Sequence, residues 1–400
     1  MVRAGALLYA IFIAFIISAI CGSLSLIYLF LDRQVADIDL SDRFDYLSEI
    51  ALNQFLNAEE FSETFEVSTS EKIRFELKPW GAFNFLKVSL IISDSTRFRC
   101  YMTGRRRIDN RKYALYMTNL NHQLGIVGNA NINGDCFVPQ GKLKNGFENG
   151  FKFTSNGISV KNSESNLTNL FFKEIKIRSE VDSVGVEPVN YDLIEAESKH
   201  NSFDTNTMLI SFSNSEVLRN ITLSGNFKIF CKETLTIESN CELNDVLIEA
   251  RKVIVKKGFD GSIQIFATDS VLIEEDVTLS YPSCIVLSNT LLPIPRAIEI
   301  SKGVNFHGDI ITGGKDGSMN QILVSEGAKI FGQIISAGQV ELKGEVNGSI
   351  MTQSFILKSP ATNYPNILIN PKINIDGLKS FYSGTIYSVF SEVSIVKELN

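Results

Sequence analysis

The chain has 400 residues, of which 44% are hydrophobic and 21% are charged, so it is too apolar to be intrinsically disordered. Its formal net charge of −7 argues against a general nucleic-acid binder, which needs a basic face to displace phosphate counterions. Three histidines and one tryptophan leave few residues for a histidine-based catalytic or metal site.

Residues 5–31 form an uncharged apolar run, GALLYAIFIAFIISAICGSLSLIYLFL. As a helix, this run would span roughly 40 Å, more than the ~30 Å hydrocarbon core of a bilayer requires. A cleaved secretory signal is the alternative, but the run is longer than an apolar signal core of about 7–15 residues, and no small-x-small site closes it. We therefore predict an uncleaved, single-pass transmembrane helix after a cytoplasmic leader at residues 1–4.

The charges on either side of this run predict its orientation. Arg3 and the terminal amine precede the run, whereas the other side begins with Asp32-Arg33 and continues through Asp37, Asp39, Asp42 and Asp45. The positive-inside rule then places the N-terminus in the cytoplasm and the C-terminal region in the periplasm or another extracytoplasmic space. The lipid bilayer of the cell membrane is thus the first expected partner.

The start MVRAG, followed by ALLYAIFIAFIIS, resembles the N-terminus of prepilin-like proteins, particularly minor pilins and pseudopilins. In that family a short basic leader ends in Gly and is cut before an apolar helix that packs into a filament. The resemblance implies processing between Gly5 and Ala6, and other envelope or filament subunits as partners. Most pilins carry Glu at the fifth mature position, where this chain has Ala10.

The helical pattern continues beyond the apolar run and then gives way to strands. Apolar residues spaced by three and four extend the helix to about Asn57, so we assign 32–62 to a helical stalk. Residues 63–120 contain alternating runs that predict a small antiparallel sheet. These runs are Lys72–Leu77, Phe85–Ile92 and Lys112–Met117.

Seven basic residues lie close together between positions 97 and 112. They are Arg97, Arg99, Arg105, Arg106, Arg107, Arg111 and Lys112. Arg105, Arg106 and Arg107 could contact an anionic partner such as lipid, glycan or an acidic protein face. The other interpretation is a solvated hairpin tip, because Asp109 and Asn110 follow as a turn.

An internal repeat determines the expected fold. The segment Leu235-Thr-Ile237 recurs as Val253-Ile-Val255 and as Val271-Leu-Ile273, and LTIESNCELNDVLIEA aligns without a gap to ILVSEGAKIFGQIISA. The pattern predicts strands of about three to five residues whose side chains alternate between inward and outward, joined by glycine-rich corners. Coils of about 18 residues built in this way stack into a parallel β-helix. The chain is thus expected to be mainly β, with apolar ladders running through the solenoid at 216–360.

The repeat glycines share columns. Gly308, Gly332 and Gly348 align with each other, and an isolated earlier copy at 128–138 places Gly134 in the same column. We therefore assign 121–138 to a first solenoid coil, 139–215 to an insertion and 361–400 to C-terminal strands that cap the last coil. Cys136 falls in the column of Ile334, and Cys241 in that of Ala328.

The coils at 322–352, ILVSEGAKIFGQIISAGQVELKGEVNGSI, resemble those of bactofilins, the polymer-forming cytoskeletal proteins. This resemblance implies end-to-end stacking into filaments without nucleotide. The membrane helix, the region before the repeats and the C-terminal tail depart from that family, and the tail puts polymerisation in doubt.

Candidate chemistry is sparse in the sequence. The six cysteines show no CxxC spacing, although one disulfide is left open, and the three histidines stand apart, so we expect no metal and no cofactor. His307 falls in an outward slot, where exposure to solvent is expected. Because no stacked acidic pair is indicated on neighbouring coils, we do not expect an enzyme.

Three functions fit these features. The first is a non-catalytic, membrane-anchored structural component of a cell-envelope assembly, similar to a minor pilin or pseudopilin and carrying a rigid β-helix. The second is a bactofilin-like scaffold that polymerises by self-association. The third is a glycan-binding or glycan-cleaving β-helix, since a long strand-lined face suits linear polymers.

Overall fold

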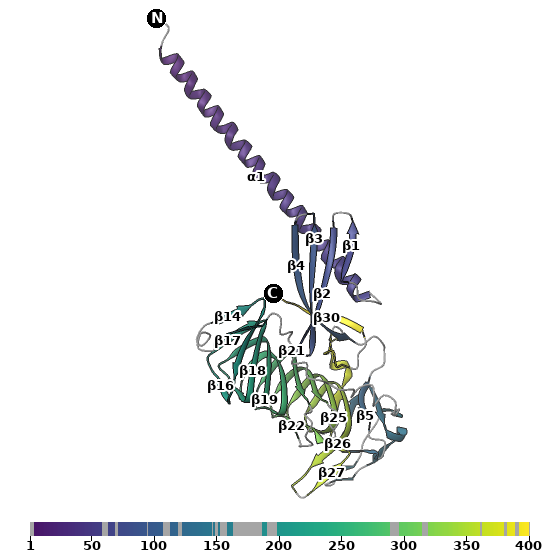
Figure 1. Cartoon of the computed structure of the whole chain (residues 1–400). Coiled ribbons are helices and arrows are strands. Elements are labelled where there is room, and N and C mark those ends of the chain that lie inside the picture. Colours follow the sequence, from purple (N-terminus) through teal and green to yellow (C-terminus); the bar gives the residue numbers. More distant parts are fainter. Residues whose placement is uncertain are drawn as a thin grey trace. The chain divides into compact units, whose positions relative to one another are not determined.

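A computed structural model of the chain (Figure 1) divides into two compact units, described separately below. The first comprises Met1–Glu76 and Val88–Arg99, and the second comprises Leu77–Lys87 and Cys100–Asn400. The structure describes residues 4–57, 63–68, 71–93, 95–106, 113–118, 122–145, 147–148, 151–152, 158–162, 186–189, 198–288, 296–313, 319–360, 362–379, 382–388 and 392–399.

One continuous helix, α1 (Ala4–Asn57), dominates the first unit. The segment from Leu7 to Ile38 is exposed along its length and is long and apolar enough to cross a membrane, as judged by length and composition. Farther along, Phe44, Leu47 and Ala51 are buried. The predicted end of the helix near Asn57 is confirmed, and the helix changes from an exposed to a packed element on the way.

The packed part of α1 lies against the strands of its own unit. The guanidinium of Arg43 donates twice to the carboxylate of Glu71, with both N···O distances 2.6 Å. The rings of Phe55 and Phe75 lie 6.0 Å apart. An apolar stripe and the bidentate ion pair between Arg43 and Glu71 therefore hold the helix on the sheet.

A five-stranded sheet has the order β1-β2-β3-β4-β30. Strand β1 pairs antiparallel with β2, and β30 pairs antiparallel with β4. The sheet thus joins the region after the helix to the C-terminal end of the chain. Its strands are β1 (Thr64–Ser68), β2 (Glu71–Trp80), β3 (Phe83–Ile92), β4 (Ser95–Arg106) and β30 (Glu392–Leu399).

The predicted third strand of this sheet belongs elsewhere. Strand β5 (Tyr113–Met117) pairs in parallel with β8 (Asp135–Val138) and with β26 (Glu345–Lys358), both in the solenoid. Its assignment to the small antiparallel sheet was wrong, because alternation of apolar residues identifies a strand without identifying its partner.

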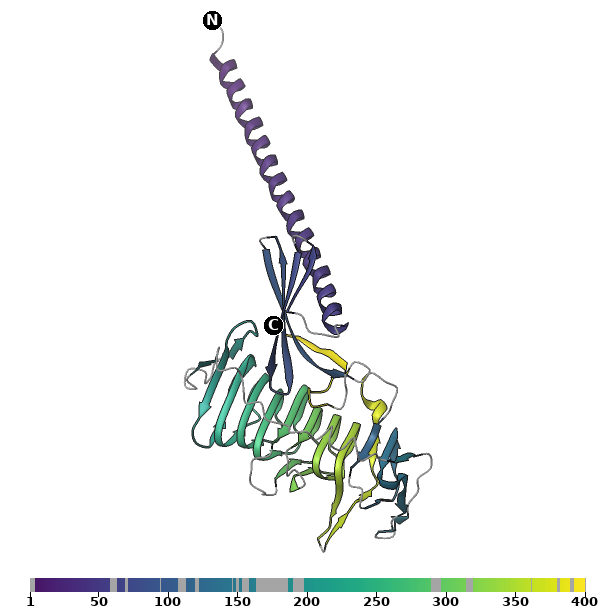
Figure 2. The ribbon, with the colours of Figure 1, turned by 45° about the vertical axis from the view of Figure 1, so that its right-hand side comes forward.

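The second unit contains a parallel β-solenoid of about nine turns with about 20 residues per turn (Figure 2). Its long strands each pair in parallel with the strand one turn away. The principal coil strands are β18 (Phe227–Ile237), β19 (Glu242–Val255), β20 (Asp260–Ile273), β21 (Thr278–Leu287), β22 (Ala297–Ile300), β23 (Asn305–Thr312), β24 (Gln321–Val324), β25 (Lys329–Leu342) and β26.

The predicted apolar ladders form one uninterrupted column. Successive strands pair Ile237 with Val255, Val255 with Ile273, and Ile273 with Ile300. The column then continues through Val324 to Leu342. Every member is buried, so the alternation in the sequence identified the inward side of the coils correctly.

The earliest repeat copy stacks on the latest coil. Ile132 of β7 (Asn131–Asn133) pairs with Ile373 of β29 (Lys372–Asn374), which in turn pairs with Val346. Cys136 pairs with Leu115, and Leu115 pairs with Ile350. The residues of the segment predicted as the first coil therefore align with the repeat columns as expected. The segment does not begin the stack, however, but lies beside β26, the last long strand of the solenoid.

Residues 139–215, predicted as an insertion, contribute strands to both ends of the solenoid. At the β26 end, β12 (Ser159–Asn162) pairs with β8. At the other end, β13 (Val186–Pro188) pairs with β15 (Thr207–Phe212), which pairs with β18. The remaining strands near that end are β14 (Ser198–Asn201), β16 (Glu216–Leu218) and β17 (Thr222–Gly225).

Short elements complete the β26 end. Strand β27 pairs antiparallel with β26, and β28 pairs with β6, so part of the predicted C-terminal cap does add strands at this end. The elements are β6 (Leu124–Val127), β9 (Leu143–Asn145), β27 (Asn363–Pro365), β28 (Ile367–Ile369), and the 3₁₀ turns η1 (Pro139–Gly141) and η4 (Ile375–Gly377). Strands β10 (Phe147–Glu148) and β11 (Phe151–Lys152) pair antiparallel with each other.

Candidate functional site

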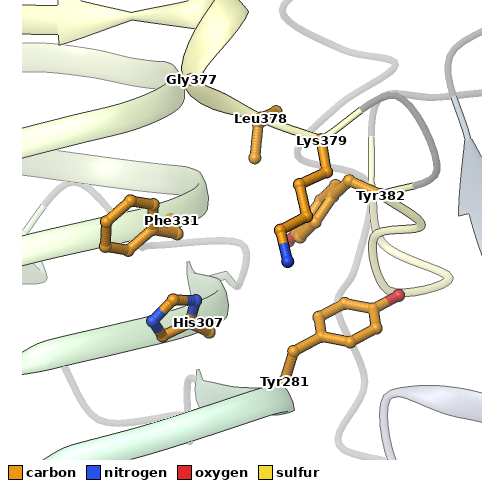
Figure 3. Close-up of a pocket in the computed structure, with 7 residues that line it drawn as sticks. All are labelled: Tyr281, His307, Phe331, Gly377, Leu378, Lys379 and Tyr382. Atoms are coloured by element: carbon orange, nitrogen blue, oxygen red, sulfur yellow. The ribbon is translucent and has the colours of Figure 1, made fainter.

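An apolar pocket lies on the outer side of the solenoid, in the second unit (Figure 3). Figure 3 shows Tyr281, His307 and Phe331 on successive strands, with their rings turned toward one shared space. The rings of His307 and Phe331 stack with centroids 4.5 Å apart and planes 8° apart, because these residues are direct partners in the β23–β25 pairing. The solenoid repeat thus builds one wall of aromatic rings.

The C-terminal residues 377–379 and 382–388, here called the strap, form the opposite wall. Leu378, Lys379 and Tyr382 line the pocket from this side, and the Lys379 side chain extends toward His307 and Tyr281 (Figure 3). The volume of this open pocket is about 200 Å³. This is enough for one ring-sized group and small beside a typical ligand pocket of about 300–1,000 Å³.

A buried carboxylate holds the strap on the solenoid. The Tyr382 hydroxyl donates to Asp309 Oδ1. The backbone N–H of Gln333 donates to the same oxygen at 3.2 Å. The Thr385 amide donates to Asp309 Oδ2 at 2.7 Å. Burial raises the pKa of Asp309, and these hydrogen bonds oppose that effect by favouring the ionised form.

The tyrosine hydroxyls at the pocket are already used in structural hydrogen bonds. The Tyr281 hydroxyl donates to the carbonyl of Ser383 at 2.9 Å, and the Tyr382 hydroxyl donates to Asp309. Burial raises the pKa of Tyr281 and the pKa of Tyr382, so both phenols stay neutral. The pocket consequently presents ring faces more than hydrogen-bonding groups.

Two basic side chains, His307 and Lys379, complete the pocket's electrostatics. Burial first, and the nearby Lys379 ammonium second, lower the pKa of His307, which favours its neutral imidazole. His307 is half-buried, which corrects its expected exposure to solvent. The residue does point outward from its coil, but the strap covers it. The pocket can therefore hold an apolar or ring-shaped group with an anionic substituent near Lys379.

A second, more polar groove lies on the same unit, with a volume of about 580 Å³. Its charged side chains are of both signs, and the Lys343 ammonium lies 2.7 Å from the Glu341 carboxylate. The groove therefore has no single strong charge. Its charged lining residues are Glu326, Lys329, Lys343, Glu345 and Lys372.

The processing-site residues and the arginines singled out from the sequence are not among the described residues that line the aromatic pocket. Gly5 and Ala6 belong to the start of α1, and processing between them stays a prediction. Arg106 Nε donates to the Glu392 carboxylate at 2.8 Å, while the backbone of Arg105 pairs with Gly384. Contact of Arg105, Arg106 and Arg107 with an anionic partner also stays a prediction, and Arg107 lies outside the described residues.

The repeat glycines mark close approaches between coils. Gly308 pairs with Gly332, and Gly332 pairs with Gly348. A Cβ atom on any of them would overlap the backbone carbonyl oxygen of the coil beneath. Gly134 falls between β7 and β8, where φ is +126°, a backbone conformation that favours glycine.

The cysteines of the solenoid behave as small core residues. All six cysteines are free thiols, so the disulfide left open by the sequence is not formed. Burial raises the pKa of Cys136 to about 12 and also raises that of Cys241. Among the described residues, no three His, Cys, Asp or Glu side chains cluster as metal ligands would.

The aromatic pocket was not found from the sequence. His307 and Phe331 occupy one outward column of the repeat, and two rings in that column were the available signal. The strap that completes the pocket comes from beyond the repeats, and no local pattern connects it to that column. Comparison with family models, with curated proteins and with solved structures finds no match for this chain.

Proposed function

We propose that the chain is a non-catalytic, membrane-anchored structural component of a cell-envelope assembly, similar to a minor pilin or pseudopilin. The observation that carries this proposal is the change of surface along α1: its first part is bare and apolar, and its last part is packed on a sheet. Such a helix serves as anchor and as structural core of a domain at once.

The bare part of α1 has the surface that a hydrocarbon environment requires. Large apolar side chains from Leu7 to Leu31 are mostly 50–70% exposed, and a soluble protein rarely leaves so large a continuous apolar surface in water. Arg3 and the terminal amine, which precede the apolar run, support a cytoplasmic N-terminus. The β-solenoid then belongs to the extracytoplasmic part.

The solenoid supports a scaffold role because it stacks coils without interruption around one apolar column. The titratable groups beside the aromatic pocket are held in structural bonds, as Tyr281 and Tyr382 illustrate. Their raised pKa values are the reverse of what activates a nucleophile. A structural role accounts for these groups without a reaction.

The aromatic pocket favours a second candidate, a glycan-binding ectodomain. Flat ring faces next to the cationic Lys379 suit a single sugar ring that carries a carboxylate. Saturable binding of an acidic oligosaccharide, lost on His307→Ala and on Phe331→Ala, would place this function ahead of a purely structural one.

A bactofilin-like polymer is the remaining alternative. Among the described strands, β12 and β13 lie at the two ends of the solenoid. β12 pairs with β8 and β13 pairs with β15, in each case toward the interior of the stack. End-to-end stacking would have to add strands beyond them. The chain also carries the five-stranded sheet and the strap, which a filament built of solenoid coils alone does not have.

N-terminal sequencing of the protein purified from its native membranes tests the proposed class. We expect Ala6 as the first residue, because the leader ends in Gly5 immediately before the apolar helix. Gly5→Leu should block processing by placing a bulky side chain at the cut, and Gly22→Leu is the matched control farther along the helix. An intact Met1 in the unaltered protein would remove the pilin-like reading and leave a plain membrane anchor.

A further inference from the structure

A stripe of apolar side chains runs along the exposed part of α1 and continues past the end of the apolar run. Its members alternate at intervals of four and three residues, which is the heptad spacing of a coiled-coil interface. All of them are exposed. The members, here called the seam, are Ile17, Cys21, Leu24, Tyr28, Leu31, Val35 and Ile38.

Lipid cannot account for the whole seam. Up to Leu31 all sides of the helix are apolar, so the seam is not distinguished there from the lipid-facing surface. After Asp32 and Arg33 the helix is polar, yet Val35 and Ile38 continue the seam with 56% and 58% of their surfaces exposed. Apolar side chains kept in register beyond the bilayer indicate a partner helix.

The helix's own sheet covers the opposite side. At about 100° per residue, Val35 lies about 180° around the helix from Phe44, and Ile38 lies about 180° from Leu47. Phe44 and Leu47 are the buried residues of the packed part, whereas the seam residues are exposed. Within the described first unit, the seam faces away from the surface that the sheet occupies.

The seam ends where the domain begins. The next two heptad positions hold Asp42 and Asp45, and Asp45 is ion-paired with Arg99 of its own sheet. Two helices paired through the seam would therefore part after Ile38. This leaves room for the bulk that each helix carries beyond that point.

The flanking charges are compatible with a second copy of the same chain. Two copies inserted with the same topology run parallel. In a parallel pair, the residue that follows Leu31 or Ile38 on one helix faces the residue that precedes Tyr28 or Val35, respectively, on the other helix. Asp39 of one helix would face Gln34 of the other, a neutral donor opposite an acceptor, and Asp32 would face Ile27. No like charges meet. Val35 at one core position with Leu24 and Leu31 at the other is the combination that favours two parallel strands.

We propose that α1 forms a parallel pair with α1 of a second copy through this seam, from Ile17 to Ile38. This deepens the proposed function, on which it rests, by naming the first partner of the anchored subunit. It also gives Cys21 a specific neighbour, because the thiols of two paired helices would face one another across the seam.

Oxidative crosslinking of the full chain in membranes tests the pair, with copper phenanthroline as the oxidant. The other five cysteines are buried, so Cys21 is the thiol that the oxidant reaches. We expect a reducible dimer that Cys21→Ser abolishes. In the Cys21→Ser background, Leu24→Cys should restore the dimer, whereas the off-seam Ile20→Cys should not.

A matched pair of charge variants tests the extramembrane part. Val35→Asp should lower the crosslinked fraction about tenfold, because it buries an unpaired carboxylate in the seam. Ala36→Asp adds the same charge one residue away, off the seam, and should leave crosslinking unchanged. Equal crosslinking through Cys at positions 20, 21 and 24, or equal effects of the two Asp variants, would overturn the seam.

Alkaline extraction of the same membranes separates the two proposals. Chains that stay in the membrane pellet but do not crosslink would overturn the pair and leave the membrane anchor in place. Chains that are extracted as soluble protein would overturn the anchor, and their crosslinking through Cys21 would still support the seam.

Discussion

At Gly308, Gly332 and Gly348, hydrogen is the only side chain that the spacing between coils permits. These residues pair with one another on three successive strands, and each faces the carbonyl oxygen of the coil below. The sequence aligned them in one column before any backbone was known. Glycine recurs at these positions because the backbones of adjacent coils approach each other closely there, whereas the residue type at neighbouring strand positions varies.

Gly332→Ala should lower the free energy of unfolding by about 1–3 kcal/mol, because the added methyl overlaps the Gly308 carbonyl and forces two coils apart. Gly125→Ala is the matched control. A Cβ there would meet its nearest atom, the Asn366 carbonyl oxygen, at an ordinary 3.5 Å. Denaturant unfolding of both variants measures the difference, and equal stabilities would show that the column is not sterically required.

The sequence predicted both the position and the pairing of some strands, but only the position of others. The ladder from Ile237 to Leu342 follows from alternation and from the constant repeat, and the structure places every member in register. Strand β5 was recognised as a strand but given the wrong sheet. The difference is physical: a repeat determines which residues share a column, whereas an isolated strand's partner depends on how distant parts of the chain meet.

The aromatic pocket shows the same limit. His307 and Phe331 were both visible in one outward column, yet Tyr382 and Lys379 reach them only because Asp309 anchors the strap. A buried carboxylate that accepts from a side-chain hydroxyl and two backbone amides leaves no periodic signal. The pocket was therefore outside what the pattern of the sequence could reveal.

The attachment of α1 to its sheet should weaken in acid. The hydrogen bond from Arg43, reinforced by its charge, lowers the pKa of Glu71 in the folded state. The contribution of this pair is therefore complete above the ordinary Glu pKa of about 4.3 and is lost as pH falls through the lowered folded-state value. The protection factors of the amides of residues 44–55, which correct hydrogen exchange for its intrinsic pH dependence, should fall over that range.

Glu71→Gln should speed this exchange at neutral pH and flatten its dependence on acid, because the charged partner is gone. Glu49→Gln, on the exposed side of the same helix, is the matched control and should keep the pH dependence. An unchanged acid response in Glu71→Gln would show that other carboxylates hold the helix.

Across the whole chain, segments distant in sequence complete one another. The repeat copy at 128–138 stacks beside the last long coil, and β30 closes an edge of the sheet that begins after the helix. The length of 400 residues suggested several globular cores, but a solenoid grows by adding coils. The apolar content likewise divides between α1 and the inward ladders.

The central claim is that α1 anchors the chain in a membrane, and alkaline extraction of cell membranes tests it most directly. The full chain should remain in the membrane pellet, because its apolar helix of about 40 Å is long enough to cross the ~30 Å hydrocarbon core. A variant lacking residues 5–31 should be recovered in the soluble fraction with its solenoid folded. Release of the full chain into the soluble fraction would contradict the account.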